Sequence, residues 1–329
     1  MSDVAPNPIV RTWYRVVDLL PLPTVRTQRR IALAALLSQA LIAVTGSIVR
    51  VTGSGLGCPT WPKCHDDSLL PIPSDEVPWW HQAIEFGNRQ IAVWIVVTTA
   101  AAIVLAVSRA RRRREVLVYA WILPASTFAQ GVLGGVTVLA GLKWWVVGAH
   151  LLVSTAMVWL AATLYVKVGQ PDDGVPVDAA PRRARSLVAA SAVALAFALA
   201  AGVTVTGAGP HAGDRTRPEA IDRLHVSIPL LTSIHTALVV VFLGLVVAAL
   251  LVIRRAYPTP EVLRRCRIVL IVVAAQSLIG VVQYFTNVPA LLVVLHVAGA
   301  CSVIAETAIL YQALRPRVDA DKAEELSRT

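Results

Sequence analysis

The sequence predicts an all-α polytopic membrane protein whose eight transmembrane helices form two parallel-repeat four-helix bundles. Three observations predict it: an apolar composition, basic residues in alternate loops, and an internal repeat. Of the 329 residues, 56% are hydrophobic and only 15% are charged, which is too apolar for a soluble protein of this length. A helix that crosses the hydrocarbon core needs about 20 apolar residues. Eight runs are long enough, at about 31–51, 86–108, 116–139, 145–167, 187–206, 226–253, 268–286 and 290–313.

Positive charge lies in every second loop. The net charge is +10, and most Lys and Arg lie near the ends of the chain or in the loops at 109–114, 182–185 and 254–267. By the positive-inside rule, these loops and both termini face the cytoplasm. The pattern predicts a multi-pass protein of a bacterial-type cytoplasmic membrane, with a basic rim against membrane lipid. This placement of charge argues against nucleic-acid binding.

An internal repeat relates the two halves of the chain. Gln130 precedes His150 by the same number of positions as Gln276 precedes His296. A shared spacing within apolar segments indicates one structural unit used twice. Because both copies start on the same side, the repeats are parallel rather than inverted.

Two further landmarks occur in the same order in both halves. The segment "VRVTGSGLG" (49–57) resembles "VTVTGAGPH" (203–211). The separation of Asn88 from His150 matches that of His235 from His296 to within a single position. The predicted organisation is a cytoplasmic N-terminal segment (1–30), a first four-helix bundle (31–167), a cytoplasmic linker (168–186), a second four-helix bundle (187–313) and a cytoplasmic tail (314–329).

Three histidines lie inside apolar runs, namely His150, His235 and His296. Ionisable groups at that depth normally face the bundle interior and serve a function. A single one would be interpreted as a core residue bonded to a carbonyl, but three at repeat-equivalent places favour metal ligands. Histidines on facing helices of a bundle can hold a haem. Zinc is disfavoured because no carboxylate or thiol accompanies them.

The halves differ at their second helix. Superposition places Glu85 on Thr232 and Asn88 on His235, so the first half has an acid and one histidine fewer. We interpret the second half as a resident cofactor site and the first as a copy modified for chemistry. Arg50 and Arg89 either pair with haem propionates or extend to water.

Cys58 and Cys64 share the first outer loop, in "CPTWPKC". Two thiols this close outside the cytoplasm favour a disulfide, with two free thiols as the alternative. A metal site is disfavoured because no second pair of ligands completes it.

At these residues the chain resembles the haem A synthase family. The matching features are the eight helices in two halves, "VRVTGSGLGCPTWPKC" after the first helix, "IEFGNR" at the second, "TGAGPHAGD" (206–214), and histidines on helices four, six and eight. The likeness spans about residues 30–313. It implies an oxidoreductase acting on a CH group, which oxidises the C8 methyl of haem O to a formyl group. The product is haem A for cytochrome c oxidase.

The resemblance also implies roles for single residues. His235 and His296 would hold a haem b in the second half, and the substrate haem O would lie in the first. Glu85 matches the family's catalytic acid, and His150 matches the helix-four ligand. The implied partners are haem O, the haem O synthase that supplies it, and an electron acceptor. The paired cysteines match loop cysteines whose family role includes a disulfide.

One departure from the family concerns Asn88, where better-known members carry His. Asn is a weak iron ligand beside imidazole, so we expect His150 alone to bind the substrate iron, unless His81 contributes. Asn88 would then hydrogen-bond to water or to Glu85.

Two rival functions compete with the synthase. A non-catalytic haem-binding membrane cytochrome that relays electrons explains the histidines, but not an acid present in one half only. A small-solute transporter built on repeats fits the parallel halves and paired histidines less well.

Overall fold

A computed structural model of the chain describes residues 7–73, 77–211, 213–214, 221–256 and 260–327. It contains eight helices that are long and apolar enough to cross a membrane, which confirms the predicted all-α polytopic class. Their bounds are α2 (Val25–Thr52), the continuous α3 (Trp79–Ile91), η1 (Ala92–Val97) and α4 (Thr98–Arg109), α5 (Arg114–Leu139), α6 (Trp144–Val168), α7 (Arg182–Ala208), α8 (Ile228–Arg255), α9 (Pro260–Phe285) and α10 (Ala290–Ala313).

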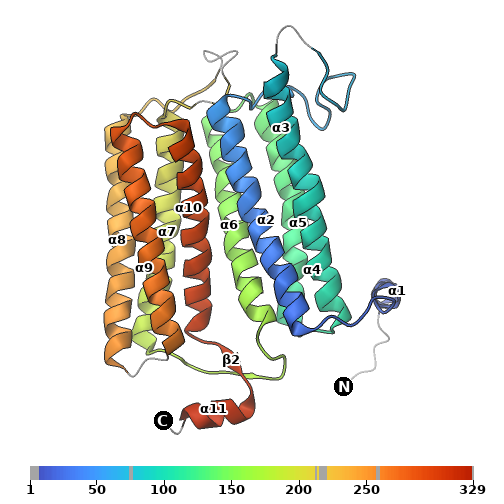
Figure 1. Ribbon diagram of the computed structural model, residues 1–329, viewed down its shortest axis with the longest axis vertical. Coiled ribbons are helices and arrows are strands. Elements are labelled where there is room, and N and C mark those ends of the chain that lie inside the picture. The colour runs from blue at the N-terminus through green and yellow to red at the C-terminus, as the bar shows by residue number, and fades with distance from the viewer. Residues whose placement is uncertain (1–6, 74–76, 212, 215–220, 257–259, 328–329) are drawn as a thin grey trace.

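The long helices form two groups that stand side by side (Figure 1). In the first group, α2 contacts α4 and α6, and α5 contacts α4 and α6. In the second group, α8 contacts α7 and α9, and α10 contacts α7 and α9. The groups meet where α10 packs on α2 and α6, and where α6 packs on α7. Each group is therefore a closed ring of four helices.

Short elements lie at the end of the molecule that carries both termini (Figure 1). They are the helices α1 (Pro8–Val17) and α11 (Ala320–Ser327), and the two-residue strands β1 (Val175–Pro176) and β2 (Arg317–Val318). β1 belongs to the linker and β2 to the tail, and they pair antiparallel. The pairing ties the C-terminal tail to the linker between the bundles.

The second span begins at Trp79, about two turns earlier than the apolar run at 86–108. Its extra turns carry His81, Gln82 and Glu85, which are polar and yet buried. Hydropathy does not detect such turns, because their side chains are satisfied by a neighbouring loop instead of by water.

The densest apolar packing lies in the halves of the helices toward the termini. Its members include Leu164, Ile253 and Leu310, all fully buried. By contrast, no residue from 274 to 300 is buried, although this stretch includes the halves of α9 and α10 that lie away from the termini. His296, one of the three histidines predicted as ligands, lies in this loosely packed stretch.

Candidate functional site

His235 on α8 and His296 on α10 face each other in the second bundle. Their ring centres lie 6.4 Å apart, with the ring planes inclined by 61°. Two imidazoles that share one metal ion through bonds of about 2.0–2.1 Å have ring centres roughly 6 Å apart. The separation therefore fits one iron held between the two rings.

A hydrogen bond determines the tautomer of His235. Its Nδ1 lies 2.8 Å from the backbone oxygen of Ala198, and because a carbonyl only accepts, Nδ1 must carry the proton. The lone pair is then on Nε2, which is the arrangement of a metal-binding histidine with outer support. Nδ1 of His296 is buried and has no hydrogen-bond partner within the described residues.

Glycines allow helices to approach both rings. A Cβ added at Gly202 would lie 3.1 Å from Cε1 of His235, and one at Gly280 would lie 3.1 Å from Cε1 of His296. Either side chain would require its neighbouring ring to shift by a few tenths of an ångström, since such contacts are closer than van der Waals distance. Together with the ring separation and the tautomer, these glycines form a site whose residues fit a flat macrocycle with two axial imidazoles.

Two glutamines make the same contact in the two bundles. Nε2 of Gln130 donates to the backbone oxygen of His150 at 3.1 Å, and Nε2 of Gln276 donates to that of His296 at 2.8 Å. A Cβ at Gly134 would lie 3.4 Å from the His150 ring. The predicted repeat thus recurs as a repeated contact, which holds the backbone of each histidine.

The first bundle has Asn88 where the second has His235. Thr45 on α2 donates from Oγ1 to Oδ1 of Asn88 at 2.7 Å. The amide oxygen of Asn88 is therefore already hydrogen-bonded to a neighbouring helix. We expected Asn88 to bond to water or to Glu85; among the described residues its partner is Thr45, and no hydrogen bond joins it to Glu85. His150 Nδ1 is buried without a hydrogen-bond partner in the described part of the chain. The π-helical turn η1 begins one helical turn after Asn88, and such turns are frequent at functional sites.

Glu85 is buried, with 6% of its side chain exposed. Its Oε1 accepts from Arg89 Nη2 at 2.6 Å, and its Oε2 accepts from the backbone N–H of Cys58 at 2.7 Å. A buried carboxylate is costly unless it is paired and hydrogen-bonded, and here both oxygens are satisfied. The acid is therefore held both by its own helix and by the first outer loop.

The side chain of Arg89 binds backbone carbonyl groups of the same loop. The guanidinium donates to the carbonyl oxygens of Cys58 at 2.9 Å, Thr60 at 3.0 Å and Lys63 at 3.1 Å. Cys58 and Cys64 form the predicted disulfide, which closes this loop. Because its guanidinium binds three carbonyl oxygens of the loop as well as Glu85, Arg89 acts here as a clamp between the helix and the loop.

The disulfide loop packs on the first bundle and contacts His81. A Cβ at Gly135 on α5 would overlap the ring of Trp61 from the loop. Nδ1 of His81 lies 2.9 Å from Ser54 Oγ, at the start of the loop, and only 4% of His81 is exposed. His81 is thus hydrogen-bonded to the loop through its Nδ1.

Arg50 joins the two bundles. Its Nη2 donates to the backbone oxygen of Thr206 on α7 at 2.9 Å, and its Nε is buried without a hydrogen-bond partner among the described residues. The outer loops also meet, since the N–H of Gly55 donates to the oxygen of Gly213 at 2.7 Å. Arg50 therefore extends across the interface between the bundles and bonds to α7.

Sequence reasoning missed the supporting residues. Thr45, Gly202 and Gly280 carried no signal, because small residues are common in membrane helices. The signal for the glutamines was present, as the repeated spacing from glutamine to histidine, but their contact was not predicted. The described residues contain no group of three or more His, Cys, Asp or Glu that could hold a bare metal ion. Two facing histidines suit a metal whose remaining ligands come from a macrocycle.

Comparison with known proteins places the chain in a family. The COX15-CtaA family, described as "Cytochrome oxidase assembly protein", matches residues 29–308. A protein of Geobacillus kaustophilus (strain HTA426) named "Heme A synthase" is 33% identical over 111 residues, which cover 33% of each chain. One of the same name from Lysinibacillus sphaericus (strain C3-41) is 29% identical over 131 residues, 40% of this chain and 41% of that one.

These alignments span only a third to two fifths of the length of the relatives. The family match is much longer, since it runs from α2 into α10 and so includes both bundles. The chain therefore belongs to the COX15-CtaA family of cytochrome oxidase assembly proteins.

Proposed function

We propose that the protein is a haem A synthase, which oxidises the C8 methyl of haem O to a formyl group and so supplies haem A to cytochrome c oxidase. The observation that carries the proposal is the difference between the bundles. The second has two facing histidines, whereas the first has Asn88 at the position that matches His235, together with the buried, clamped Glu85. Family membership and the names of the relatives support the same reaction.

His235 and His296 would hold a resident haem b through their imidazole nitrogens. The facing rings, the Nδ1 proton on His235 and the flanking glycines support this assignment. Bound there, the haem supplies one-electron redox chemistry, tuned by its ligands and by burial. The protein's part is to keep both imidazoles oriented.

The substrate haem O would lie in the first bundle, with His150 as the ligand to its iron. Asn88, at the position that matches His235, is bonded to Thr45 and would offer no imidazole to that iron. We expect the substrate iron to have one strong protein ligand, which leaves its opposite face accessible to a small molecule.

The reaction would proceed by two hydroxylations of the methyl carbon, followed by loss of water from the resulting diol. Written with water as the oxygen donor, each hydroxylation replaces a C–H bond by a C–O bond, passes two electrons to an electron acceptor and releases two protons. Glu85 is the buried carboxyl group of this bundle, and we assign it the transfer of one of these protons through its carboxylate oxygens. Arg89 and the Cys58 N–H keep the carboxylate in place.

The proposed setting is the cytoplasmic membrane, with both termini in the cytoplasm. The basic loops lie at the end of the molecule that carries the termini, which supports this orientation. A haem O synthase in the same membrane would supply the substrate, and an external acceptor would take up the electrons.

The haem content of the purified protein tests the proposal. The protein is extracted from membranes, its absorption spectrum is recorded, and the released haems are identified by mass. Haem B together with haem O or haem A is the expected result. Preparations without any haem would contradict both the synthase and its alternative.

A non-catalytic cytochrome that relays electrons is the second candidate. The facing histidines support it equally, and haem B alone in the purified protein would favour it. Glu85 and its clamp weigh against it, because a relay has no use for a buried acid in one bundle only.

A further inference from the structure

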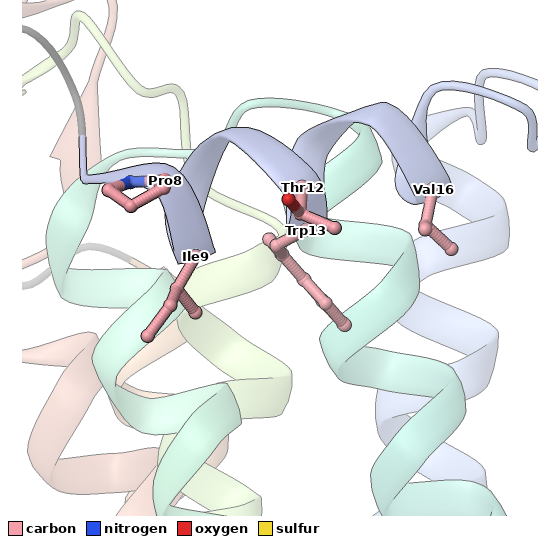
Figure 2. Close-up of a pocket in the computed structure, with 5 residues that line it drawn as sticks. All are labelled: Pro8, Ile9, Thr12, Trp13 and Val16. Carbon is pink, nitrogen blue, oxygen red and sulfur yellow. The ribbon is translucent and has the colours of Figure 1, made fainter.

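A short helix, α1, precedes the first membrane span and lies outside the family match, which begins at residue 29. Asn7 caps it, since its side chain accepts from the N–H of Ile9 at 2.9 Å, and Pro8 occupies the first turn. Both features are typical of a helix start. The helix packs on α4 and lies across the ends of the long helices (Figures 1 and 2).

The two faces of α1 differ in chemistry. Ile9, Trp13 and Val16 point toward the long helices, as Figure 2 shows, yet Ile9 is 76% exposed and Val16 is 55% exposed. Arg11 and Arg15 are also exposed, and helical geometry places them about opposite to the apolar side chains. An apolar face with basic residues on the other is typical of a helix that lies in a membrane interface.

Contacts with the bundle hold α1 in place. The guanidinium of Arg111 lies 3.7 Å above the ring of Tyr14 and forms an ion pair with Asp18 at 2.8 Å. The ring of Trp13 lies 5.2 Å from that of Trp121, which is on α5 and 48% exposed. Because Trp121 belongs to a membrane-crossing helix, the apolar face of α1 continues the surface that this helix presents to lipid.

We propose that α1 is an interfacial helix that binds the anionic lipid surface on the side of the termini. Its apolar face would lie against the acyl chains, and Arg11 and Arg15 would contact lipid phosphates. Three observations select lipid as the occupant: the exposed apolar side chains, their continuity with α5, and the basic side chains opposite them. Leu19 and Leu22, which are 85% and 68% exposed, extend the apolar surface toward the first span.

Spin labels on the full chain test the proposal. Single cysteines at Ile9 and Val16, and at Arg11 and Arg15 as matched controls, are introduced after the free thiols at Cys266 and Cys301 are replaced by Ala. The labelled protein is placed in vesicles of phosphatidylcholine mixed with phosphatidylglycerol. Paramagnetic broadening by oxygen, which concentrates in the bilayer, is compared with that by a water-soluble nickel complex.

The oxygen-to-nickel ratio should be several-fold higher at Ile9→Cys and Val16→Cys than at the two controls. In vesicles of phosphatidylcholine alone, the ratio at Ile9→Cys should fall, and the double change R11Q/R15Q should remove this dependence on lipid charge. Equal nickel access at all four positions would place α1 in water. Shielding of the apolar positions from both reagents would indicate a protein partner. Either result overturns the proposal, and so does a ratio that does not respond to lipid charge.

Discussion

The turns between the last two helices of each bundle have the same unusual backbone conformation. Gly141 and Leu142 have φ values of 66° and 57°, and Asn287 and Val288 have values of 60° and 58°. Positive φ is uncommon outside glycine and is most unfavourable for a β-branched residue such as Val. The offset along the chain from the first turn to the second equals the offset from His150 to His296. One backbone unit thus positions a histidine-bearing helix in each bundle.

The second helices of the bundles do not match in this way. The offset from Asn88 to His235 exceeds by a single position the offset from Arg109 to Arg255, the residues that end the two helices. The first bundle therefore contains an extra residue between 88 and 109, and η1 (Ala92–Val97) lies there. A π-helical bulge is how a helix takes up an added residue. The origin of the bundles as copies of one unit stays a prediction, which these matches support.

The comparison teaches that one scaffold carries two kinds of site. Where the chain keeps the spacing, it keeps a histidine and its supporting glutamine. The helix that gains a residue carries Asn88 and Glu85, and the disulfide loop binds that acid. If the two bundles have separate functions, substitutions in one bundle should leave the haem bound in the other unchanged.

The largest expected effect is the loss of one haem from one bundle. Replacing His235 or His296 by Ala should remove haem b, because a single imidazole remains on that iron. Haem content and the absorption spectrum measure it. His150→Ala is the matched control and should keep haem b while haem O is lost. Loss of haem b from the control alone would reverse the assignment of the bundles.

Glu85→Gln should stop the chemistry while both haems remain. The amide keeps the shape of the side chain but cannot transfer the proton, so we expect haem A formation to fall by about 10²–10⁴-fold. Chromatography of haems extracted from cells measures the rate. Glu115→Gln, at the opposite end of the bundle, is the control. An unchanged rate with Glu85→Gln would exclude this acid from the reaction.

Asn88→His should make the first bundle resemble the second. A second imidazole beside the substrate iron should raise the amount of haem O that co-purifies and give that haem the spectrum of a two-histidine site. Asn88→Leu, which removes the bond to Thr45 without adding a ligand, is the control. If the spectra of Asn88→His and Asn88→Leu agree, residue 88 does not face the substrate iron.

The smallest expected effect comes from the two glutamines. Gln276→Leu should speed the release of haem b, and Gln130→Leu that of haem O, each by about tenfold, because outer-shell partners orient a ligand without binding the metal. Transfer of haem to an acceptor protein measures release. Each variant serves as the control for the other, and an effect of either one on the opposite bundle would show that the bundles are not independent.

Much of the fold was predictable, because hydropathy and charge report directly on membrane crossing. The run at 290–313 matches α10, and the basic run at 109–114 separates α4 from α5. The first turns of α3 escaped prediction, since buried polar residues such as Gln82 resemble loop residues to any hydropathy measure. α1 also escaped, because a helix of so few turns is too short to span a membrane.

Sequence spacing singled out the candidate histidines of the site but not the residues that support them. The spacing of His235 and His296 identified them as a pair, and the structure brings their rings together. The clamp of Arg89 on three loop carbonyls was not foreseen, because carbonyl acceptors exist at every residue and leave no trace in the sequence. Thr45 was missed for a similar reason: its partner, Asn88, lies on another helix, far along the chain.

The sequence by itself determined the number of spans, the family, the disulfide pair and the positions of the histidines, since these depend on residue type and spacing along the chain. Only the tertiary structure decided which donors and acceptors meet. It placed Glu85 between Arg89 and the loop, bound Arg50 to the other bundle and oriented His235 through Ala198. The physical reason is that a buried polar group must find a partner, and that partner is set by the packing of distant segments.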